Sequence, residues 1–305
     1  MKRKAKILAA GIATMDIYCH QGRMYPGGNE YNIAYNSHIQ GAQAAFMGIF
    51  ADDRAGKLLE ETLRKRGIDT SFSHHEKGAS GYALVDIRDG DRVFLDWNKQ
   101  GVTDLYPFDF TKEEIDYMKT FDVTCISWGA RVTPVQIKKL KQSGVFVCYD
   151  FYDNFTDKAI QEIAPYIQYA FFSCSHLTAE ETKDVLQKAA DFGCEIAVGT
   201  RGSNPTIAWD GMRFYEQKTY RVEVKDTMGA GDAYISAFLT NYLSVAEADE
   251  FSVKDDKIQY SLSEAAKFAA QVVAKDGALG IGYDVDVNRL SELIHLSPSE
   301  HPAIP

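Results

Sequence analysis

The segment Asp226–Phe238 reads "DTMGAGDAYISAF". Gly229, Ala230 and Gly231, which have little or no side chain, precede Asp232, and the residues that follow have the apolar spacing of a helix. Glycines allow backbone conformations that other residues resist and let a ligand approach the amide groups closely. The first amides of a helix have no partner within it and lie at the positive end of its dipole. The segment therefore predicts an anion site at a helix start.

Asp232 would lie directly beside that anion. A carboxylate is a poor ligand for an anion, but it can take a proton from a hydroxyl group while nearby amides stabilise the charge on a transferring phosphoryl group. The spacing alone also allows a structural interpretation, in which Asp232 caps the helix and the glycines only close a turn. The segment favours phosphoryl transfer with Asp232 as general base, and it leaves the cap as the alternative.

The composition limits the class of protein. The chain has 305 residues, 45% hydrophobic and 25% charged, which is typical of a soluble globular protein. Its net charge of −10 gives no basic footprint for nucleic acid or an anionic membrane, and no stretch approaches the roughly 20 apolar residues of a membrane span. The five cysteines are scattered without metal-ligand spacing. We expect a reduced, cytoplasmic protein with no nucleic-acid or membrane partner.

Strand-like and helix-like segments alternate along most of the chain. Continuous apolar runs, which predict strands buried on both faces, occupy residues 5–12, 123–129, 145–151, 169–174 and 194–200. Segments 53–67 and 178–193 have helical spacing, and each ends at a glycine. This alternation predicts an α/β fold with a mostly parallel sheet between two layers of helices.

Residues 81–97, "GYALVDIRDGDRVFLDW", depart from that pattern. They alternate with period two on either side of a turn, which predicts a hairpin with one polar face. The hairpin is either a plain surface feature or a lid over a site that Arg92 helps to line. We expect one domain over residues 1–285, with lid segments at about 16–26 and 77–100, and a loosely held tail over residues 286–305.

A second motif supports phosphoryl transfer, whereas the Walker and protein-kinase motifs are missing. Residues 26–56 read "PGGNEYNIAYNSHIQGAQAAFMGIFADDRAG". In this order, the two motifs resemble the signatures of the ribokinase-like (PfkB) sugar kinases. The resemblance implies a ribokinase-like three-layer α/β/α fold with a mostly parallel central sheet and a small β-sheet lid. It also implies ATP-dependent phosphorylation of a sugar hydroxyl, and a homodimer that forms through the lid.

The same resemblance assigns roles to individual residues. It implies Asp232 as the catalytic base, Gly229, Ala230 and Gly231 as the anion hole, Asp16, Gly27, Gly28 and Asn32 as acceptor ligands, and Thr200, Gly202, Asp226 and Thr227 as ATP ligands. The nucleotide loop "GTRGSNPTIAWDG" departs from the family at Pro205, where a glycine is usual. Mg²⁺ is implied as a cofactor, but the family's Asn-x-x-Glu element lacks its asparagine here. The metal ligands therefore stay unassigned, and a monovalent-cation requirement stays open.

Short stretches point to one subgroup of the family. "YPGGN", "DGDRVF" and "TIAWDG" resemble the fructoselysine 6-kinases, or fructosamine kinases. This implies phosphorylation of the 6-hydroxyl of a glycated amino acid, whose carboxylate Arg92 could bind. Two alternatives remain: a kinase of a plain ketose or sugar acid such as fructose or 2-keto-3-deoxygluconate, and an inactive regulator that binds sugar or nucleotide.

Overall fold

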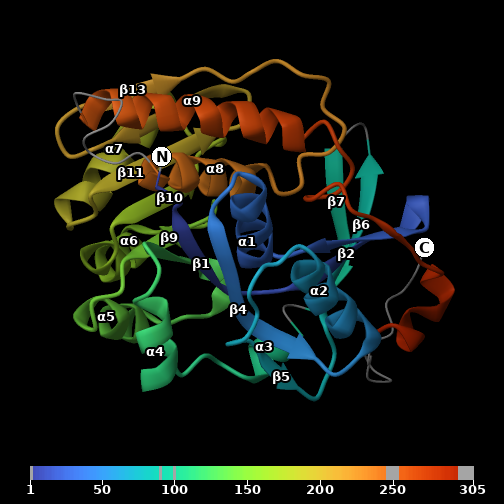
Figure 1. Cartoon of the computed structure of the whole chain (residues 1–305). Coiled ribbons are helices and arrows are strands. Elements are labelled where there is room, and N and C mark those ends of the chain that lie inside the picture. Colours follow the sequence, from blue (N-terminus) through green and yellow to red (C-terminus); the bar gives the residue numbers. More distant parts are fainter. Residues whose placement is uncertain (1–2, 89–90, 99–100, 245–253, 295–305) are drawn as a thin grey trace.

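The computed structural model describes residues 3–88, 91–98, 101–244 and 254–294, and this part of the chain contains two β-sheets (Figure 1). The large sheet has nine strands in the order β13-β12-β11-β10-β9-β8-β1-β4-β5, and the small one has five in the order β14-β3-β2-β6-β7. The predicted α/β fold with a mostly parallel central sheet and a small second sheet is confirmed.

The strands of the large sheet are mostly parallel. They are β1 (Lys6–Gly11), β4 (Gln43–Ala51), β5 (His74–Glu76), β8 (Val123–Ser127), β9 (Val147–Asp150), β10 (Tyr169–Ser173), β11 (Ile196–Arg201), β12 (Asn204–Trp209) and β13 (Phe214–Gln217). Only the pairings of β12 with β11 and with β13 are antiparallel among the described strands of this sheet. The five apolar runs predicted as strands form β1, β8, β9, β10 and β11.

Helices cover both faces of this sheet. They are α1 (Asn29–Ile39), α2 (Arg54–Lys65), α3 (Val102–Leu105), α4 (Lys112–Met118), α5 (Pro134–Gln142), α6 (Asp157–Ile163), α7 (Ala179–Asp191), α8 (Ala230–Ser244) and α9 (Lys254–Val272). Alternate residues of β1 enter different cores: Ile7 and Ala9 pack with α1, α2, α8 and α9, whereas Leu8 and Ala10 pack with α4 to α7. This period of two is the reason that the buried strands are apolar throughout.

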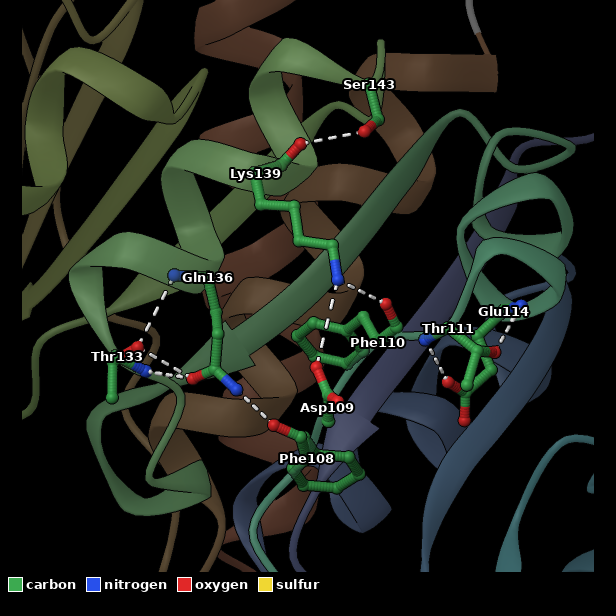
Figure 2. Close-up of polar contacts among 9 residues, drawn as sticks. All are labelled: Phe108, Asp109, Phe110, Thr111, Glu114, Thr133, Gln136, Lys139 and Ser143. Carbon is green, nitrogen blue, oxygen red and sulfur yellow. Dashed lines mark hydrogen bonds and ion pairs between the residues drawn. The ribbon is translucent and has the colours of Figure 1, made fainter.

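Side-chain caps fix the starts of several helices. The predicted capping box of Thr178 and Glu181 is present at α7. Figure 2 shows two further boxes, Thr111 with Glu114 at α4 and Thr133 with Gln136 at α5. In the same view, α5 anchors the segment that leads to α4: Gln136 donates to the Phe108 carbonyl, and Lys139 Nζ donates to the Phe110 carbonyl at 2.7 Å and pairs with Asp109 at 3.8 Å. These contacts brace the helical layer on the face opposite α1 and α8.

The small sheet, called the lid below after its predicted role, lies beside the large one, with β7 at one edge next to β6 (Figure 1). Its strands are β2 (Thr14–Tyr18), β3 (Arg23–Gly27), β6 (Gly81–Arg88), β7 (Asp91–Trp97) and β14 (Tyr283–Asp284). β6 and β7 pair antiparallel, as the alternating pattern predicts. Arg92 belongs to β7, but its side chain lies outside the described residues, as does the tip of the hairpin at 89–90.

Part of the expected tail is not loose. A short 3-10 helix spans Val287–Glu292, Leu290 is 4% exposed, and Ile294 is fully buried. The Leu293 carbonyl accepts a hydrogen bond from the Ala55 amide of α2 at 3.1 Å. The apolar residues of the tail therefore close the core beside α2 up to residue 294, and residues 295–305 lie outside the described part. Across the described residues, no helix combines the length and apolar character that a membrane crossing needs.

The packing of α2 on β4 leads to a first prediction. A Cβ atom on Gly56 would lie 2.2 Å from the Ala51 carbonyl oxygen, and backbone cannot give way as a side chain can. We expect Gly56→Ala to lower the free energy of unfolding, measured by urea denaturation, by about 3 kcal/mol. Gly144→Ala is the control, because its Cβ would enter open space and only its positive φ opposes it, at a cost of about 1 kcal/mol. Equal losses would contradict the close contact.

Candidate active site

The Asp232 carboxylate lies where α1 and α8 begin, beside the carboxyl ends of the parallel strands. It is 9% exposed and accepts two side-chain hydrogen bonds. Asn29 Nδ2 donates to Oδ1 at 2.7 Å, and Asn32 Nδ2 donates to Oδ2 at 2.7 Å. Both oxygens are thus oriented by amides of α1. In an open α/β sheet this edge is the usual place for a ligand.

Asp150, the last residue of β9, joins the same group. Asn29 Nδ2 also donates to Asp150 Oδ2 at 2.9 Å, so that one amide links two carboxylates. The Tyr152 amide donates to the other oxygen of Asp150 at 3.0 Å, and the Tyr152 hydroxyl lies 3.1 Å from Ser127 Oγ. Tyr152 adopts a φ of +57°, which is strained for a bulky residue and is characteristic of functional sites.

Burial and mutual repulsion change the acidity of these groups. Burial, followed by the charges of Asp150, Glu30 and Asp16, raises the pKa of Asp232 well above its usual range, while the Asn32 amide opposes this shift. Burial raises the pKa of Asp150 to about 6. A carboxylate with a raised pKa is a stronger base, so this environment suits Asp232 for accepting a proton from a hydroxyl group.

The predicted anion loop, residues 226–231, has the positive φ angle and the open backbone that its glycines allow. Gly229 has a φ of +73°, and a Cβ atom there would lie 2.6 Å from the Ala278 side chain. A Cβ atom on Gly231, by contrast, would point into open space. Ala230 begins α8, and its amide donates to the Thr227 carbonyl at 3.3 Å. The loop is therefore closed toward Ala278 and open at Gly231, where a ligand could approach the backbone.

The predicted acceptor ligands lie at the crossing between the large sheet and the lid. Asp16 is on β2 and 5% exposed, and its charge acts on Asp232, so the two carboxylates face one region. Gly27 provides the space for Asp16, because a Cβ atom on Gly27 would lie 2.3 Å from Asp16 Oδ2. Gly28 has a φ of +105°, and a Cβ atom there would lie 2.6 Å from the Ile12 carbonyl oxygen. Gly27 and Gly28 therefore allow close packing where the chain passes from the lid to the large sheet. Asn32 is hydrogen-bonded to Asp232.

The predicted ATP ligands are spread along the same edge. Thr200, the last residue but one of β11, pairs with Ser173 of β10, and its hydroxyl donates to the Phe172 carbonyl at 3.4 Å. Gly202 lies in the turn to β12 with a φ of +60°, and Pro205 is accommodated within β12 itself. Thr227 is exposed within the anion loop, whereas the buried Asp226 carboxylate accepts hydrogen bonds from the Met228 and Gly277 amides.

The acidic residues after β10 take part in a helix cap and a surface ion pair. Glu181 caps α7 through Thr178, and Glu180 pairs with Lys183 at 3.0 Å on the surface. Among the residues that the structure describes, no three His, Cys, Asp or Glu side chains are grouped to hold a metal ion.

Sequence reasoning missed Asn29, Glu30 and Asp150. Asn29 follows the Gly27-Gly28 pair and lies one helical turn before Asn32, so it could have been placed on the same helix face. Asp150 could have been noticed as an acid at the carboxyl end of a buried strand. Glu30 gave no signal, because a glutamate in the first turn of a helix is ordinarily solvated.

Glu30 is fully buried beneath this site. Its Oε2 accepts a hydrogen bond from the Ile12 amide at 3.0 Å, and its Oε1 has no hydrogen-bond partner. A Cβ atom on Gly11 would lie 2.2 Å from the Glu30 carboxyl carbon, so the glycine at the end of β1 makes room for this side chain. Burial raises the pKa of Glu30 to about 7, and the nearby Ser127 and the Ile12 amide oppose this shift.

This pKa gives a prediction for stability against pH. The unfolded chain ionises Glu30 near pH 4.5, whereas the folded protein keeps the proton until about pH 7, so the free energy of unfolding falls as pH rises through this window. Glu30→Gln removes this term and keeps an acceptor for the Ile12 amide. Between pH 5 and pH 8, we expect wild type to lose roughly 2–3 kcal/mol more than the variant, measured by urea unfolding. Parallel pH profiles would contradict a buried, protonated Glu30.

Comparison with known sequences identifies the family. The profile of the pfkB family carbohydrate kinases matches residues 3–280. The fructosamine kinase FrlD of Bacillus subtilis (strain 168) is 32% identical over 281 residues, which cover 91% of this chain and 94% of that protein. The fructoselysine 6-kinase of Escherichia coli (strain K12) is 30% identical over 234 residues, which cover 76% and 87% of the two chains.

A solved structure agrees in fold. Arabidopsis thaliana ribokinase complexed with ribose and ATP superimposes with a TM-score of 0.74 at 19% identity, covering 90% of this chain and 95% of that one. The matched profile spans both signature motifs and the residues around Asp232. This chain belongs to the pfkB family of carbohydrate kinases and is an ATP-dependent carbohydrate kinase.

Proposed function

We propose that the protein transfers the γ-phosphoryl group of ATP to the 6-hydroxyl of fructoselysine or a related fructosamine. The identities of about 30% with a fructosamine kinase and a fructoselysine 6-kinase, over most of each chain, support this acceptor class. The observation that carries the proposal is the charge of the site. Four buried carboxyl groups lie there, and the charges of three of them, Asp150, Glu30 and Asp16, act on the fourth, Asp232.

Among the described residues, the buried charged side chains are all Asp or Glu, and none is Lys, Arg or His. An acidic site attracts a ligand of the opposite charge, so this site favours a ligand that brings positive charge. A fructosamine carries a cationic secondary amine, whereas fructose and 2-keto-3-deoxygluconate do not. The acidic site therefore favours the glycated amino acid over the plain sugar or sugar acid.

In the proposed reaction, the Asp232 carboxylate accepts the proton of the attacking hydroxyl. The hydroxyl oxygen forms a bond to the γ-phosphorus as the bond from that phosphorus to the β-γ bridging oxygen breaks, and ADP leaves. Asn29 and Asn32 hold the carboxylate in a fixed orientation throughout. The amides at the start of α8 stabilise the charge on the transferring group.

We propose that Mg²⁺ enters with the nucleotide. When bound, it would neutralise charge on the phosphate oxygens, which supply most of its ligands in kinases of many folds.

We also propose that two copies of the chain pair through the lid, where Phe94 and Trp97 of β7 are 48% and 58% exposed and offer apolar surface.

Asp232→Asn tests the catalytic role. The variant keeps the size and most of the polarity of the side chain but cannot accept the proton, so we expect turnover to fall by about 10²- to 10⁴-fold. ATP affinity, measured by calorimetry, should stay within about threefold of wild type, and the melting temperature serves as the control for folding. Turnover near that of wild type would leave Asp232 with only the role of a helix cap.

The acceptor is tested by measuring ADP release with ATP and Mg²⁺ over a panel of fructoselysine, other fructose-amino acids, fructose, 2-keto-3-deoxygluconate and a nucleoside. We expect kcat/KM for a fructose-amino acid to exceed that for fructose by about 100-fold, because fructose lacks the cationic amine that an acidic site attracts. A plain sugar or sugar acid as the best acceptor would overturn the fructosamine assignment. No turnover over the whole panel would point to a regulator.

A further inference from the structure

One hydrogen bond joins the lid directly to the anion loop. The Tyr18 hydroxyl, at the end of β2, donates to Asp226 Oδ2 at 2.5 Å. Tyr18 is fully buried and Asp226 is 6% exposed, so solvent does not compete for this bond. The two residues are 208 positions apart in the sequence. A strand of the small sheet is thereby tied to the first residue of the motif that ends at Asp232.

The Asp226 carboxylate also accepts hydrogen bonds from two backbone amides. Its Oδ1 accepts the Met228 amide at 2.9 Å, which folds the anion loop back on itself. Its Oδ2 accepts the Gly277 amide at 2.8 Å in addition to the Tyr18 hydroxyl. Residue 277 directly precedes Ala278, on which Gly229 packs. One buried carboxylate therefore fixes the lid strand, the anion loop and the turn below it relative to one another.

Apolar packing reinforces the same contact. Tyr18, Tyr25 and Val85 form a small cluster of their own in the lid, separate from the two large cores. The rings of Tyr18 and Tyr25 meet edge to face, with their centroids 4.9 Å apart. Met228, the residue before Gly229, packs against this cluster. A displacement of β2 would therefore act on the anion loop through van der Waals contact as well as through the hydrogen bond.

β2 also carries Asp16, two residues before Tyr18. Side chains two residues apart in a strand lie on the same face of the sheet. Under the function proposed above, on which this inference rests, Asp16 binds the acceptor and the anion loop holds the phosphoryl group. We propose that Tyr18 is a positioning residue that couples acceptor binding at Asp16 to the conformation of the loop 226–231. When the bound acceptor holds β2 in place, the amides at the start of α8 are then oriented toward the phosphoryl group that is transferred.

Tyr18→Phe tests this coupling, because it keeps the ring in the cluster and removes only the hydroxyl. The measured quantity is the ratio of the dissociation constants of the ATP analogue AMP-PNP without and with a saturating acceptor, determined by calorimetry with the full-length protein. In wild type we expect the acceptor to tighten binding about tenfold, and in Tyr18→Phe we expect this ratio to fall toward one. We also expect kcat to fall about tenfold, while KM for the acceptor changes less than threefold.

Tyr25→Phe is the matched control. It removes a hydroxyl from the same cluster, but that hydroxyl donates to Gln21 Oε1 at 2.8 Å and not to the anion loop. We expect this variant to keep the wild-type ratio and kcat. Tyr18→Phe with the wild-type ratio, or a wild-type ratio of one, would overturn the coupling, and so would equal losses in the two variants.

The test uses whichever acceptor the wild type phosphorylates fastest. If that acceptor is a plain sugar, the fructosamine assignment fails, and the ratio still decides the role of Tyr18. Amide hydrogen exchange of residues 226–231 gives a second readout that a purely structural role would not change. Acceptor binding should slow exchange in wild type and in Tyr25→Phe, and an equal slowing in Tyr18→Phe would contradict the proposal.

Discussion

The two hydrogen bonds from Asn29 and Asn32 to the Asp232 carboxylate are the contact on which the arrangement of the site depends. They join the first turns of α1 and α8, two helices from opposite ends of the sequence that pack on the same face of the large sheet. Because both donors are amides on one helix, the carboxylate cannot rotate without losing one of them. The sheet brings the strand ends together, and this contact fixes the direction in which the base points.

Burial makes the same site costly to build. Several acids are removed from water within one region, and burial raises the pKa values of Asp232, Asp150 and Glu30. A stable fold holds such a group only if the rest of the structure compensates, and here two apolar cores on either side of the sheet do so. The burial that destabilises the free protein is also what makes the Asp232 carboxylate a stronger base.

The sequence predicted the parts that depend on local pattern. Continuous apolar runs gave five central strands, a Thr-x-x-Glu pattern gave the cap of α7, and the glycines around Ala230 gave the exposed turn before α8. The 9-residue strand β4 was missed, because it lies within the signature at residues 26–56, which was interpreted through its glycines.

Other features depend on tertiary structure. Asn29 and Asp150 meet only through the strand order of the sheet, which no local pattern contains. The buried state of Glu30 depends on Gly11, and the fixed position of residues 286–294 depends on the gap beside α2, so both follow from tertiary packing.

The complementary shapes of Gly11 and Glu30 restrict how this chain can change. A side chain on residue 11 would occupy the volume that the Glu30 carboxyl group already fills. Any larger residue at position 11 is therefore accessible only after Glu30 has been shortened, and restoring a glutamate at position 30 requires a glycine at position 11 first. Substitutions at these two positions must therefore occur in a set order. This order limits the change from a sequence that carries the buried acid to one that does not.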